Sequence, residues 1–521
     1  MSLFSLPDKD GKKEDLRILG KLKKPKITST KKIKGSLIDL IATAEIEVNR
    51  YFAKFKNDFL IIRDEETLKQ YIDTVIKDGI VAIDTETNGL DTISGICAGI
   101  CLYSPSNKAA YIPLHHISYM TGTELKNQLS HNIIKKYFSQ LGNVKIIMHN
   151  ASFDIEVLQN LVGIKVKCYW DTMIAANLLN ENEKHSLKYL HDKYCGDGTG
   201  VYSITNLFEG LVFTQVPINL GYLYAARDAK MTYELYKYQT RYLSDNPEKG
   251  YEDLKSCYDV MMNIEMPLID AIVEAETYGI GLSAETTEKL RAEYLNKYIE
   301  LETSLQNMIS NIETEIKDYI RRKSHFGKAV KDMAKLQYPV NFGSPVQVKE
   351  LLYDVLRVKY KGNNQSTGEE ELKEIKNLNS DNTFVCKLID TLLEYRGISK
   401  LFSTYIEALP ASINKKTGKI HARFNQYGAK TGRMSSSNPN LQNIPSHNKD
   451  IRKMFKGDDS KTLYDTDNKL SLYPFDIINT DKGYIRADSL KKDDIVLDDS
   501  QNKHTIADIS KEGLNIILCL K

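Results

Sequence analysis

The sequence lacks long apolar runs, a secretory signal and a strong charge of either sign. No apolar run approaches the roughly 20 residues that a membrane-spanning helix needs. The N-terminus carries lysines but no apolar signal core, so we expect a cytoplasmic protein without a membrane partner. The formal net charge is only +2, so total charge does not indicate a nucleic-acid partner.

Cysteine is also sparse, with seven scattered residues. Cys97 and Cys101 lie in the apolar run GICAGICLY, with no histidine or second cysteine pair nearby. We interpret them as buried thiols in a reducing compartment, and a zinc site is the less favoured alternative.

The chain has 521 residues, of which 41% are hydrophobic and 27% charged, a composition typical of globular proteins. That length predicts about three or four domains. Residues 1–55 read as a basic arm and a short helix. The arm is either solvated and disordered or touches phosphates. Its lysines cluster around Pro25 and are Lys21, Lys23, Lys24, Lys26, Lys31, Lys32 and Lys34.

The remaining pattern changes along the chain. Residues 56–245 alternate β-rich runs with helical stretches, which predicts an α/β domain. A helical period dominates from about residue 246 to 410 and is followed by the loop SSSNPNLQNIPS. Short strands with turns make up residues 471–521. We expect domain boundaries near residues 55, 245 and 470.

The run GIVAIDTETNGLD places Asp84 and Glu86 two residues apart, hence on one face of a strand. Two such carboxylates repel, which raises a pKa unless a cation lies between them. An edge strand with a polar face is the alternative. The flanking Ile-Val-Ala-Ile favours a buried central strand, where charge is costly.

Two further runs add oxygen ligands. In KIIMHNASFDIEVLQ a β run ends at Asn150 and Asp154 opens a helix, and in GYLYAARDAKMTYELY Tyr224 and Asp228 are i, i+4 neighbours. The chain thus offers four carboxylates and one phenol, a hard-oxygen set that suits Mg²⁺ or Mn²⁺. Two such ions about 4 Å apart could orient a water and stabilise the leaving oxygen of a phosphodiester.

The strings DTET, NASFD and YAARD resemble the three motifs (DxE, NxxFD, YxxxD) of the DEDDy proofreading 3′–5′ exonucleases. The resemblance implies an RNase H-like sheet with flanking helices, and a frayed single-stranded 3′ end of DNA as substrate. It implies that Tyr224 helps to position the attacking water and that Asn150 supports the site. The two metal ions would be held by Asp84, Glu86, Asp154 and Asp228.

Later segments resemble the thumb side of the family A DNA polymerases, the DNA polymerase I type. They are EAETYGIGLSAE, FGSPVQVKELLYDVL, STGEEELKE and YRGISKLFSTYIEAL. The string KIHARFNQYGAKTGRMSSSNPNLQNIPS then resembles the loop that precedes the palm in that family. The resemblance implies a mostly helical thumb followed by the start of an α/β palm.

The chemistry of that loop suits DNA. Lys430 and Arg433 supply positive charge, and short polar side chains follow them, a mixture that suits phosphate, sugar and minor-groove contacts. A solvated loop is the alternative. The resemblance implies that Arg433 contacts the primer terminus. Template and primer would be held by Asn440, Gln442 and Asn443.

The run IRKMFKGDDSKTLYDTD resembles the start of the palm, and counting from Ile451 puts Asp467 on its first catalytic, Mg²⁺-binding carboxylate. Asp465 is the competing assignment. From Asn468 the sequence departs from the family pattern, and the second palm carboxylate and the nucleotide-gripping helix do not follow. We therefore expect that this chain alone does not polymerise DNA.

The last residues, SLYPFDIINTDKGYIRADSLKKDDIVL, have the pattern of β-hairpins. They resemble the N-terminal splicing region of inteins, with Thr480 and Gly483 at the turn, which implies a small all-β, Hint-like fragment. Ser471 would be the nucleophile that attacks the carbonyl of Leu470. The implied partner is a second chain with the C-terminal intein fragment and the rest of the polymerase. The alternatives are a degenerate tail after a truncation and a segment that caps an incomplete palm.

The leading hypothesis is the N-terminal half of a split DNA-directed DNA polymerase that acts in DNA replication. It would carry its own proofreading exonuclease, bind primer–template DNA and be completed by protein trans-splicing, in a bacterial or phage-infected cell. One alternative is a stand-alone exonuclease with a DNA-binding polymerase remnant. Another is a non-splicing DNA-binding subunit that pairs with a separate polymerase chain.

Overall fold

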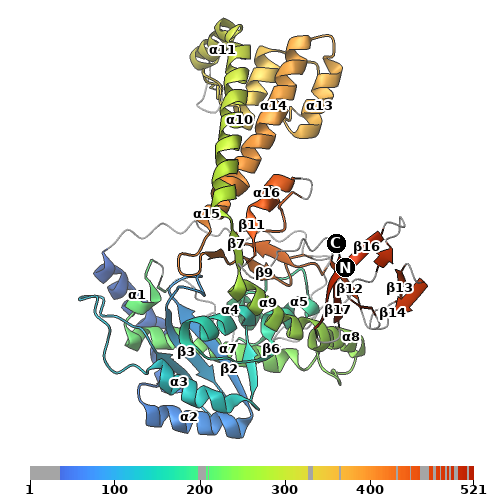
Figure 1. Ribbon diagram of the computed structural model, residues 1–521. Coiled ribbons are helices and arrows are strands. Elements are labelled where there is room, and N and C mark those ends of the chain that lie inside the picture. Colours follow the sequence, from blue (N-terminus) through green and yellow to red (C-terminus); the bar gives the residue numbers. More distant parts are fainter. Residues whose placement is uncertain are drawn as a thin grey trace. The chain divides into compact units, whose positions relative to one another are not determined.

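A computed structural model gives the arrangement of the chain (Figure 1). Several predicted residues lie outside the part that it describes: the lysines of the basic arm, Lys430, and both Asp465 and Asp467. The described residues are 36–196, 207–208, 210–326, 333–362, 365–429, 432–445, 448–457 and short stretches between 469 and 520.

The chain divides into two compact units, and both are discontinuous in sequence. The first unit consists of residues 1–279 and 408–444, and the second of residues 280–407 and 445–521. The loop that resembles the approach to the palm therefore packs with the exonuclease-like region. The domain boundaries expected from the sequence differ from this division and stay predictions.

A mixed six-stranded sheet in the order β1-β4-β3-β2-β5-β6 is the frame of the first unit. β2, β5 and β6 run parallel, and β3 pairs antiparallel with both β2 and β4. This sheet with packed helices confirms the predicted α/β architecture. Its strands are β1 (Phe59–Ile61), β2 (Ile80–Thr87), β3 (Cys97–Tyr103), β4 (Ala109–Pro113), β5 (Lys145–Met148) and β6 (Cys168–Asp171).

The longest helix of this unit, α7 (Ile218–Gln239), packs along β2, β3 and β4. α2 (Glu65–Asp78) leads into the central strand β2. It begins where the Asp64 side chain accepts a hydrogen bond from Thr67 N at 2.8 Å, and ends at Gly79 with φ 67°. The other α-helices are α1 (Leu37–Phe52), α3 (His131–Phe138), α4 (Ala151–Glu156), α5 (Thr172–Leu179), α6 (Leu187–Tyr194), α8 (Lys255–Val260), α9 (Met266–Tyr278) and α15 (Ala408–Ala411).

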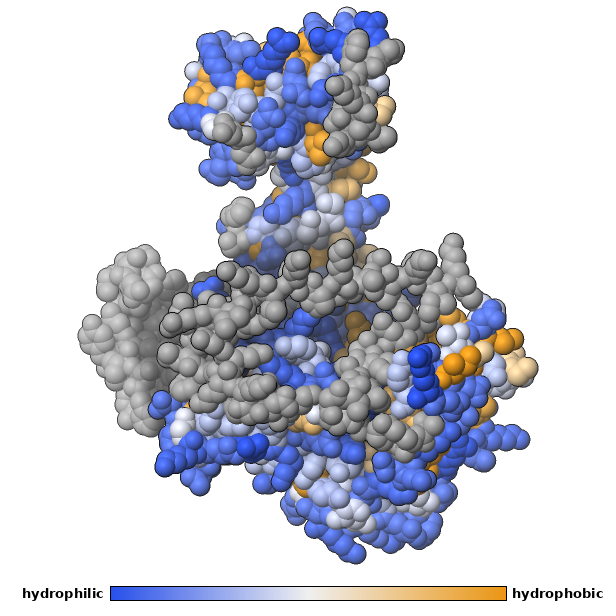
Figure 2. Space-filling model, turned by 180° about the vertical axis from the view of Figure 1, so that it is seen from behind, coloured by the Kyte–Doolittle hydropathy of each residue, from blue (hydrophilic) through white to orange (hydrophobic). Residues whose placement is uncertain are grey.

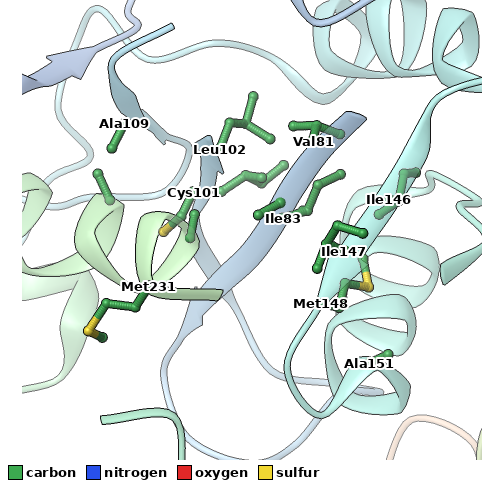
Figure 3. Close-up of a cluster of buried hydrophobic side chains, with 14 of the residues drawn as sticks. Val81, Ile83, Cys101, Leu102, Ala109, Ile146, Ile147, Met148, Ala151 and Met231 are labelled. Atoms are coloured by element: carbon green, nitrogen blue, oxygen red, sulfur yellow. The ribbon is translucent and has the colours of Figure 1, made fainter. Parts of the chain in front are cut away.

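The core of the first unit is built on the central strands (Figure 3). Val81 and Ile83 of β2 are fully buried, as is Ile147 of β5. Each such side chain contributes roughly 1.5–3 kcal/mol by leaving water, which holds β2 and the acidic residues at its end in a fixed place. Trp170 of β6, the single tryptophan of the chain, is buried in the same core and can report on its unfolding.

Residues 408–444 add three short strands to the first unit: β8 (Lys419–Ile420), β9 (Arg423–Asn425) and β10 (Ser435–Ser437). β9 and β10 pair antiparallel, with Ser436 opposite Phe424.

The second unit contains the predicted long helices. α10 and α14 lie side by side, and the hydroxyls of Tyr298 and Tyr395 are 2.9 Å apart between them. The predicted amphipathic run forms α10, which begins where Ser283 Oγ accepts from Thr286 N. The α-helices are α10 (Ala284–Ser310), α11 (Glu313–Phe326), α12 (Pro345–Lys349), α13 (Glu369–Leu378), α14 (Thr383–Leu401) and α16 (Lys449–Lys453). β7 (Ile280–Leu282) pairs antiparallel with β11 (Phe455–Lys456).

The tail forms strands in the order β12-β17-β16-β15-β13-β14. In the hairpin of β13 and β14, Thr480 pairs with Gly483, at the place of the predicted turn. The intein interpretation stays a prediction. The strands are β12 (Lys469–Leu472), β13 (Ile477–Thr480), β14 (Gly483–Arg486), β15 (Ile495–Leu497), β16 (Lys503–Glu512) and β17 (Asn515–Leu520).

Within the described ranges, no helix is both long and apolar enough to cross a membrane. The described surface seen in Figure 2 is largely hydrophilic, with separate hydrophobic patches. Large exposed apolar side chains such as Ile46, Leu90 and Met120 lie far apart in the sequence, the first in α1 and the other two outside any helix or strand.

Candidate active site

Asp84 and Glu86 lie at the end of the buried strand β2, as the i, i+2 spacing predicts. Asp84 lies opposite Cys101 of β3, and ligand atoms of Asp84, Glu86 and Cys101 all lie within 4.8 Å of one another. Burial raises the pKa of the Cys101 thiol well above its usual range, so this thiol stays protonated and is a poor ligand. The two carboxylates are the candidate metal ligands of this group.

Asp154 comes from α4 and approaches the same strand end. Its Oδ1 accepts hydrogen bonds from Thr85 N at 3.0 Å and from Thr85 Oγ1 at 2.5 Å. Asn150, which precedes α4, has the left-handed φ of 67° that asparagine tolerates better than most residues. This sharp entry into the helix places Asp154 beside the residue that separates Asp84 from Glu86.

Asp171, which was not predicted as a site residue, fixes the start of α4. Its carboxylate accepts from Asn150 N at 3.1 Å, Ala151 N at 2.7 Å and Met173 N at 2.8 Å. It therefore caps α5 and holds the turn that presents Asp154. The sequence signal was an aspartate at the end of a β run just before a helix, in WDTM.

Tyr224 and Asp228 lie on α7, one turn apart, as predicted. Two cations that were not predicted contact them. Lys188 Nζ donates to Tyr224 Oη at 2.6 Å and lies 3.1 Å from Asp228 Oδ2, and the fully buried Arg227 donates from Nε to Asp228 Oδ1 at 3.2 Å. In the sequence these cations look like ordinary helix-surface charges.

The carboxylates of Asp84 and Glu86 have raised pKa values, because nearby positive charge does not compensate their burial and mutual repulsion. Burial, and then the charges of Asp154, Asp228 and Glu86, raise the pKa of Asp84 well above its usual range. Burial raises the pKa of Glu86 to about 8 and that of Asp154 to about 7. Bound divalent cations would relieve this cost, and an all-oxygen donor set suits Mg²⁺ or Mn²⁺. The residues therefore fit the metal ions that the sequence implied.

The polymerase-like loop adjoins this site within the same unit. Tyr427 Oη donates to Asn150 Oδ1 at 3.3 Å. Further along the loop, Arg433 is exposed, and Ser436 Oγ accepts from Leu441 N at 3.3 Å. The other predicted DNA-contacting residues are likewise exposed; they are Asn440, Gln442 and Asn443.

A cavity of about 670 Å³ lies between the exonuclease-like region and residues 408–444. Its wall includes an ionic group in which Arg423 Nη1 bonds both Glu156 of α4 and Glu276 of α9. Glu156 also accepts from Thr92 Oγ1 at 2.5 Å, and Glu276 from Phe424 N. None of these contacts was predicted, because Arg423 is 267 residues from Glu156 in the sequence.

The remaining predicted site residues are described only in part. The backbone of Ser471 lies in β12, which pairs antiparallel with β17, and Thr480 and Gly483 close a hairpin. No side-chain geometry is described for these three residues. Asp467 and Lys430 lie outside the described residues.

Comparison with known proteins assigns both regions. Residues 59–243 match the family described as "3'-5' exonuclease", and residues 306–469 match "DNA polymerase family A". The chain therefore carries a 3′–5′ exonuclease domain and part of a family A DNA polymerase domain.

Individual relatives agree. The chain is 30% identical to "DNA polymerase I" of Borreliella burgdorferi over 82% of its own length and 42% of the relative. It is 30% identical to "DNA polymerase I" of Pseudomonas aeruginosa over 74% of its length and 39% of the relative. The chain thus spans less than half of these relatives.

A solved structure titled "POL domain of Pol1 from M. smegmatis complex with DNA primer-template and dNTP" matches with a TM-score of 0.51. The match is 18% identical and covers 74% of this chain and 56% of that one, so it supports the fold alone.

Proposed function

We propose that the first unit removes nucleotides from the 3′ end of DNA by metal-dependent hydrolysis of the terminal phosphodiester. The observation that carries this proposal is the closeness of Asp84 and Glu86 on β2, whose ligand atoms lie within 4.8 Å of each other. Asp154 of α4 and Asp228 of α7 lie near enough for their charges to raise the pKa of Asp84. The match of residues 59–243 to the 3′–5′ exonuclease family supports it.

The carboxylates of Asp84, Glu86, Asp154 and Asp228 would hold two divalent ions. Bound ions supply positive charge that polarises the attacking water and balances the leaving oxygen. Tyr224 orients the water through its phenol. The water oxygen bonds to phosphorus, the bond from phosphorus to the 3′ oxygen of the preceding nucleotide breaks, and that oxygen takes up a proton. The products are a 5′-mononucleotide and a strand shortened by one residue with a 3′-hydroxyl.

The test uses a 5′-labelled single-stranded oligonucleotide with Mg²⁺, resolved on a denaturing gel. The parent chain should produce a ladder that shortens from the 3′ end, and EDTA should stop it. Asp84→Ala should abolish the ladder. Asp73→Ala is the matched control, because the side chain of Asp73 on α2 is 44% exposed and forms an ion pair with Lys69 at 2.7 Å. An undiminished ladder from Asp84→Ala would refute the metal assignment.

We further propose that the loop with Arg433, Asn440, Gln442 and Asn443 binds primer–template DNA. The exposure of these side chains and the family A match support this role. Asp467 would become a Mg²⁺ ligand of a completed palm, and the second chain that completes it stays a prediction. The test is anisotropy of a labelled primer–template: Arg433→Ala should weaken binding, and unchanged affinity at two salt concentrations would contradict the proposal.

For the tail, we propose that Ser471 Oγ attacks the carbonyl carbon of Leu470. The C–O ester bond forms, the peptide C–N bond breaks, and the amine of Ser471 takes up the proton. The sequence pattern and the Thr480–Gly483 hairpin support this role. Hydroxylamine should then release a fragment that ends at Leu470, detectable by mass spectrometry. Ser471→Ala should prevent the release and Ser510→Ala should not; release from Ser471→Ala would remove Ser471 from this role.

A further inference from the structure

Lys188 is a largely buried cation inside the proposed exonuclease site. Its side chain is 17% exposed, and that of Asp228 is 14% exposed. Lys188 enters from α6, whereas the two groups that it contacts, Tyr224 and Asp228, lie on α7. It therefore joins the phenol and one carboxylate of the site from a separate element.

The direction of the hydrogen bond at Tyr224 follows from chemistry. An ammonium group has only donors, so in the 2.6 Å contact the phenol oxygen must accept. The hydrogen of Tyr224 is then directed away from Lys188. The ring is held on two further sides: Phe208 meets it edge-on at 5.4 Å between centroids, and the Arg227 guanidinium lies 4.6 Å from its centroid.

A purely structural role, docking α6 on α7, would be the simplest explanation of Lys188. Other contacts of α6 already hold it on α7. One turn later on α6, His191 Nε2 bonds Glu234 of α7 at 2.6 Å, and Leu187 and Leu190 are buried in the same core. The position of Lys188 at the carboxylates, rather than along the remaining helix contact, points to the site.

We propose that Lys188 is a positioning residue of the exonuclease reaction, which fixes the Tyr224 phenol as a donor toward the attacking water and anchors Asp228. This inference rests on the proposed exonuclease function. The positive charge of Lys188 also offsets part of the repulsion among the four carboxylates.

The first measurement is the rate of removal of the 3′-terminal nucleotide by the full chain with Mg²⁺. Lys188→Met, which keeps the length and loses the charge, should lower kcat by about 10- to 100-fold with KM little changed. Lys188→Arg should restore part of the loss. The matched control is Lys184→Met, because Lys184 lies four residues earlier, is exposed, and its ammonium lies 6.0 Å from the Tyr189 ring centroid.

The second measurement is a double-mutant cycle with Tyr224→Phe. If Lys188 acts through the phenol, Lys188→Met should cost much less in the Tyr224→Phe background than in the parent. Additive losses, or an unchanged rate in Lys188→Met, would overturn the proposal. Trp170 fluorescence reports folding, and if Lys188→Met does not fold, Lys188→Gln serves in the same cycle.

Failure of the underlying function gives a different result. In that case the parent chain itself shows no Mg²⁺-dependent shortening of the oligonucleotide. An active parent that is inactivated by Asp84→Ala but indifferent to Lys188→Met refutes only the role of Lys188.

Discussion

Two groups of acids in the first unit, one buried and one partly exposed on β2, differ in which positive charges compensate them. Glu156 and Glu276 share the guanidinium of Arg423 and also accept from Thr92 and from the backbone of Phe424. At the end of β2, by contrast, neither Asp84 nor Glu86 forms a hydrogen bond through its carboxylate with any residue that the structure describes.

The first group shares a cation that belongs to the chain, whereas the second has room for a bound cation. The compensation in the first group is incomplete, because burial raises the pKa of Glu156 to about 8 and its Oε1 has no hydrogen-bond partner among the described residues. A buried carboxylate costs free energy unless a partner compensates it. In the first group the partner is part of the chain. In the second, the cost remains in the metal-free protein, and a bound cation would recover it. A carboxylate without a compensating cation in the chain is thus a better indication of a ligand site here than a buried carboxylate as such.

Removing the internal partner should have the largest effect. Arg423→Met leaves Glu156 and Glu276 buried without their shared cation, so the free energy of unfolding should fall by about 3–5 kcal/mol. Urea titration followed by Trp170 fluorescence measures it. Arg241→Ala is the control, since the exposed Arg241–Glu248 pair is worth about 0–1 kcal/mol. Equal losses in both variants would erase the distinction between a buried cluster and a surface pair.

The pH dependence of stability should report on the second group through its response to Mg²⁺, because burial raises the pKa of Glu156 in the first group to about 8 as well. The pKa values of Asp84, Glu86 and Asp154 are raised in the folded protein, so the native state binds more protons than the unfolded state between about pH 4 and 8. Stability in EDTA should therefore fall by more than about 1 kcal/mol as the pH rises from 5 to 8. Mg²⁺ should reduce that fall, because its ligands must be deprotonated. Parallel curves with and without Mg²⁺ would argue against the site.

Neutralising one carboxylate of the second group tests whether the repulsion among its acids is relieved by Mg²⁺. Asp84→Asn removes one charge from the repelling set, so the metal-free protein should gain about 1 kcal/mol of stability while its Mg²⁺-dependent rise in Tm disappears. Differential scanning calorimetry in EDTA and in Mg²⁺ measures both quantities. A variant that is less stable in EDTA yet still responds to Mg²⁺ would show that Asp84 is a structural acid.

The smallest effect on stability is expected in the exposed loop. Arg433→Ala should leave Tm unchanged, because Arg433 is solvent-exposed. Its effect should appear only with DNA, as weaker binding and a salt dependence of log K shallower by about 1. A lowered Tm without DNA would mean that Arg433 holds the loop together.

The sequence predicts the strand and helix positions of the candidate site acids because their spacing is local. The i, i+2 pair in DTET fixes the strand face of Asp84 and Glu86, and the i, i+4 pair Tyr224 and Asp228 fixes a helix face. The α/β alternation and the long helix α10 follow from apolar periods in the same way.

What sequence reasoning missed depends on contacts between distant segments. Asp171 accepts a hydrogen bond from Ala151 N at the start of a helix 20 residues earlier, and Lys188 contacts Tyr224 from 36 residues away. Arg423 joins acids 267 and 147 residues earlier in the chain. No local pattern distinguishes these side chains from surface charges, since their role arises only when the elements pack.

The discontinuity of the first unit has a consequence for synthesis on the ribosome. Glu156 is made 267 residues before its cation. At roughly 5–20 residues per second, the nascent exonuclease domain waits on the order of 15–50 s for Arg423 to be made. During that interval Glu156 and Glu276 have no arginine to pair with, so their burial as charged groups is uncompensated. The first unit therefore reaches its final form only after the intervening helical segment has been made.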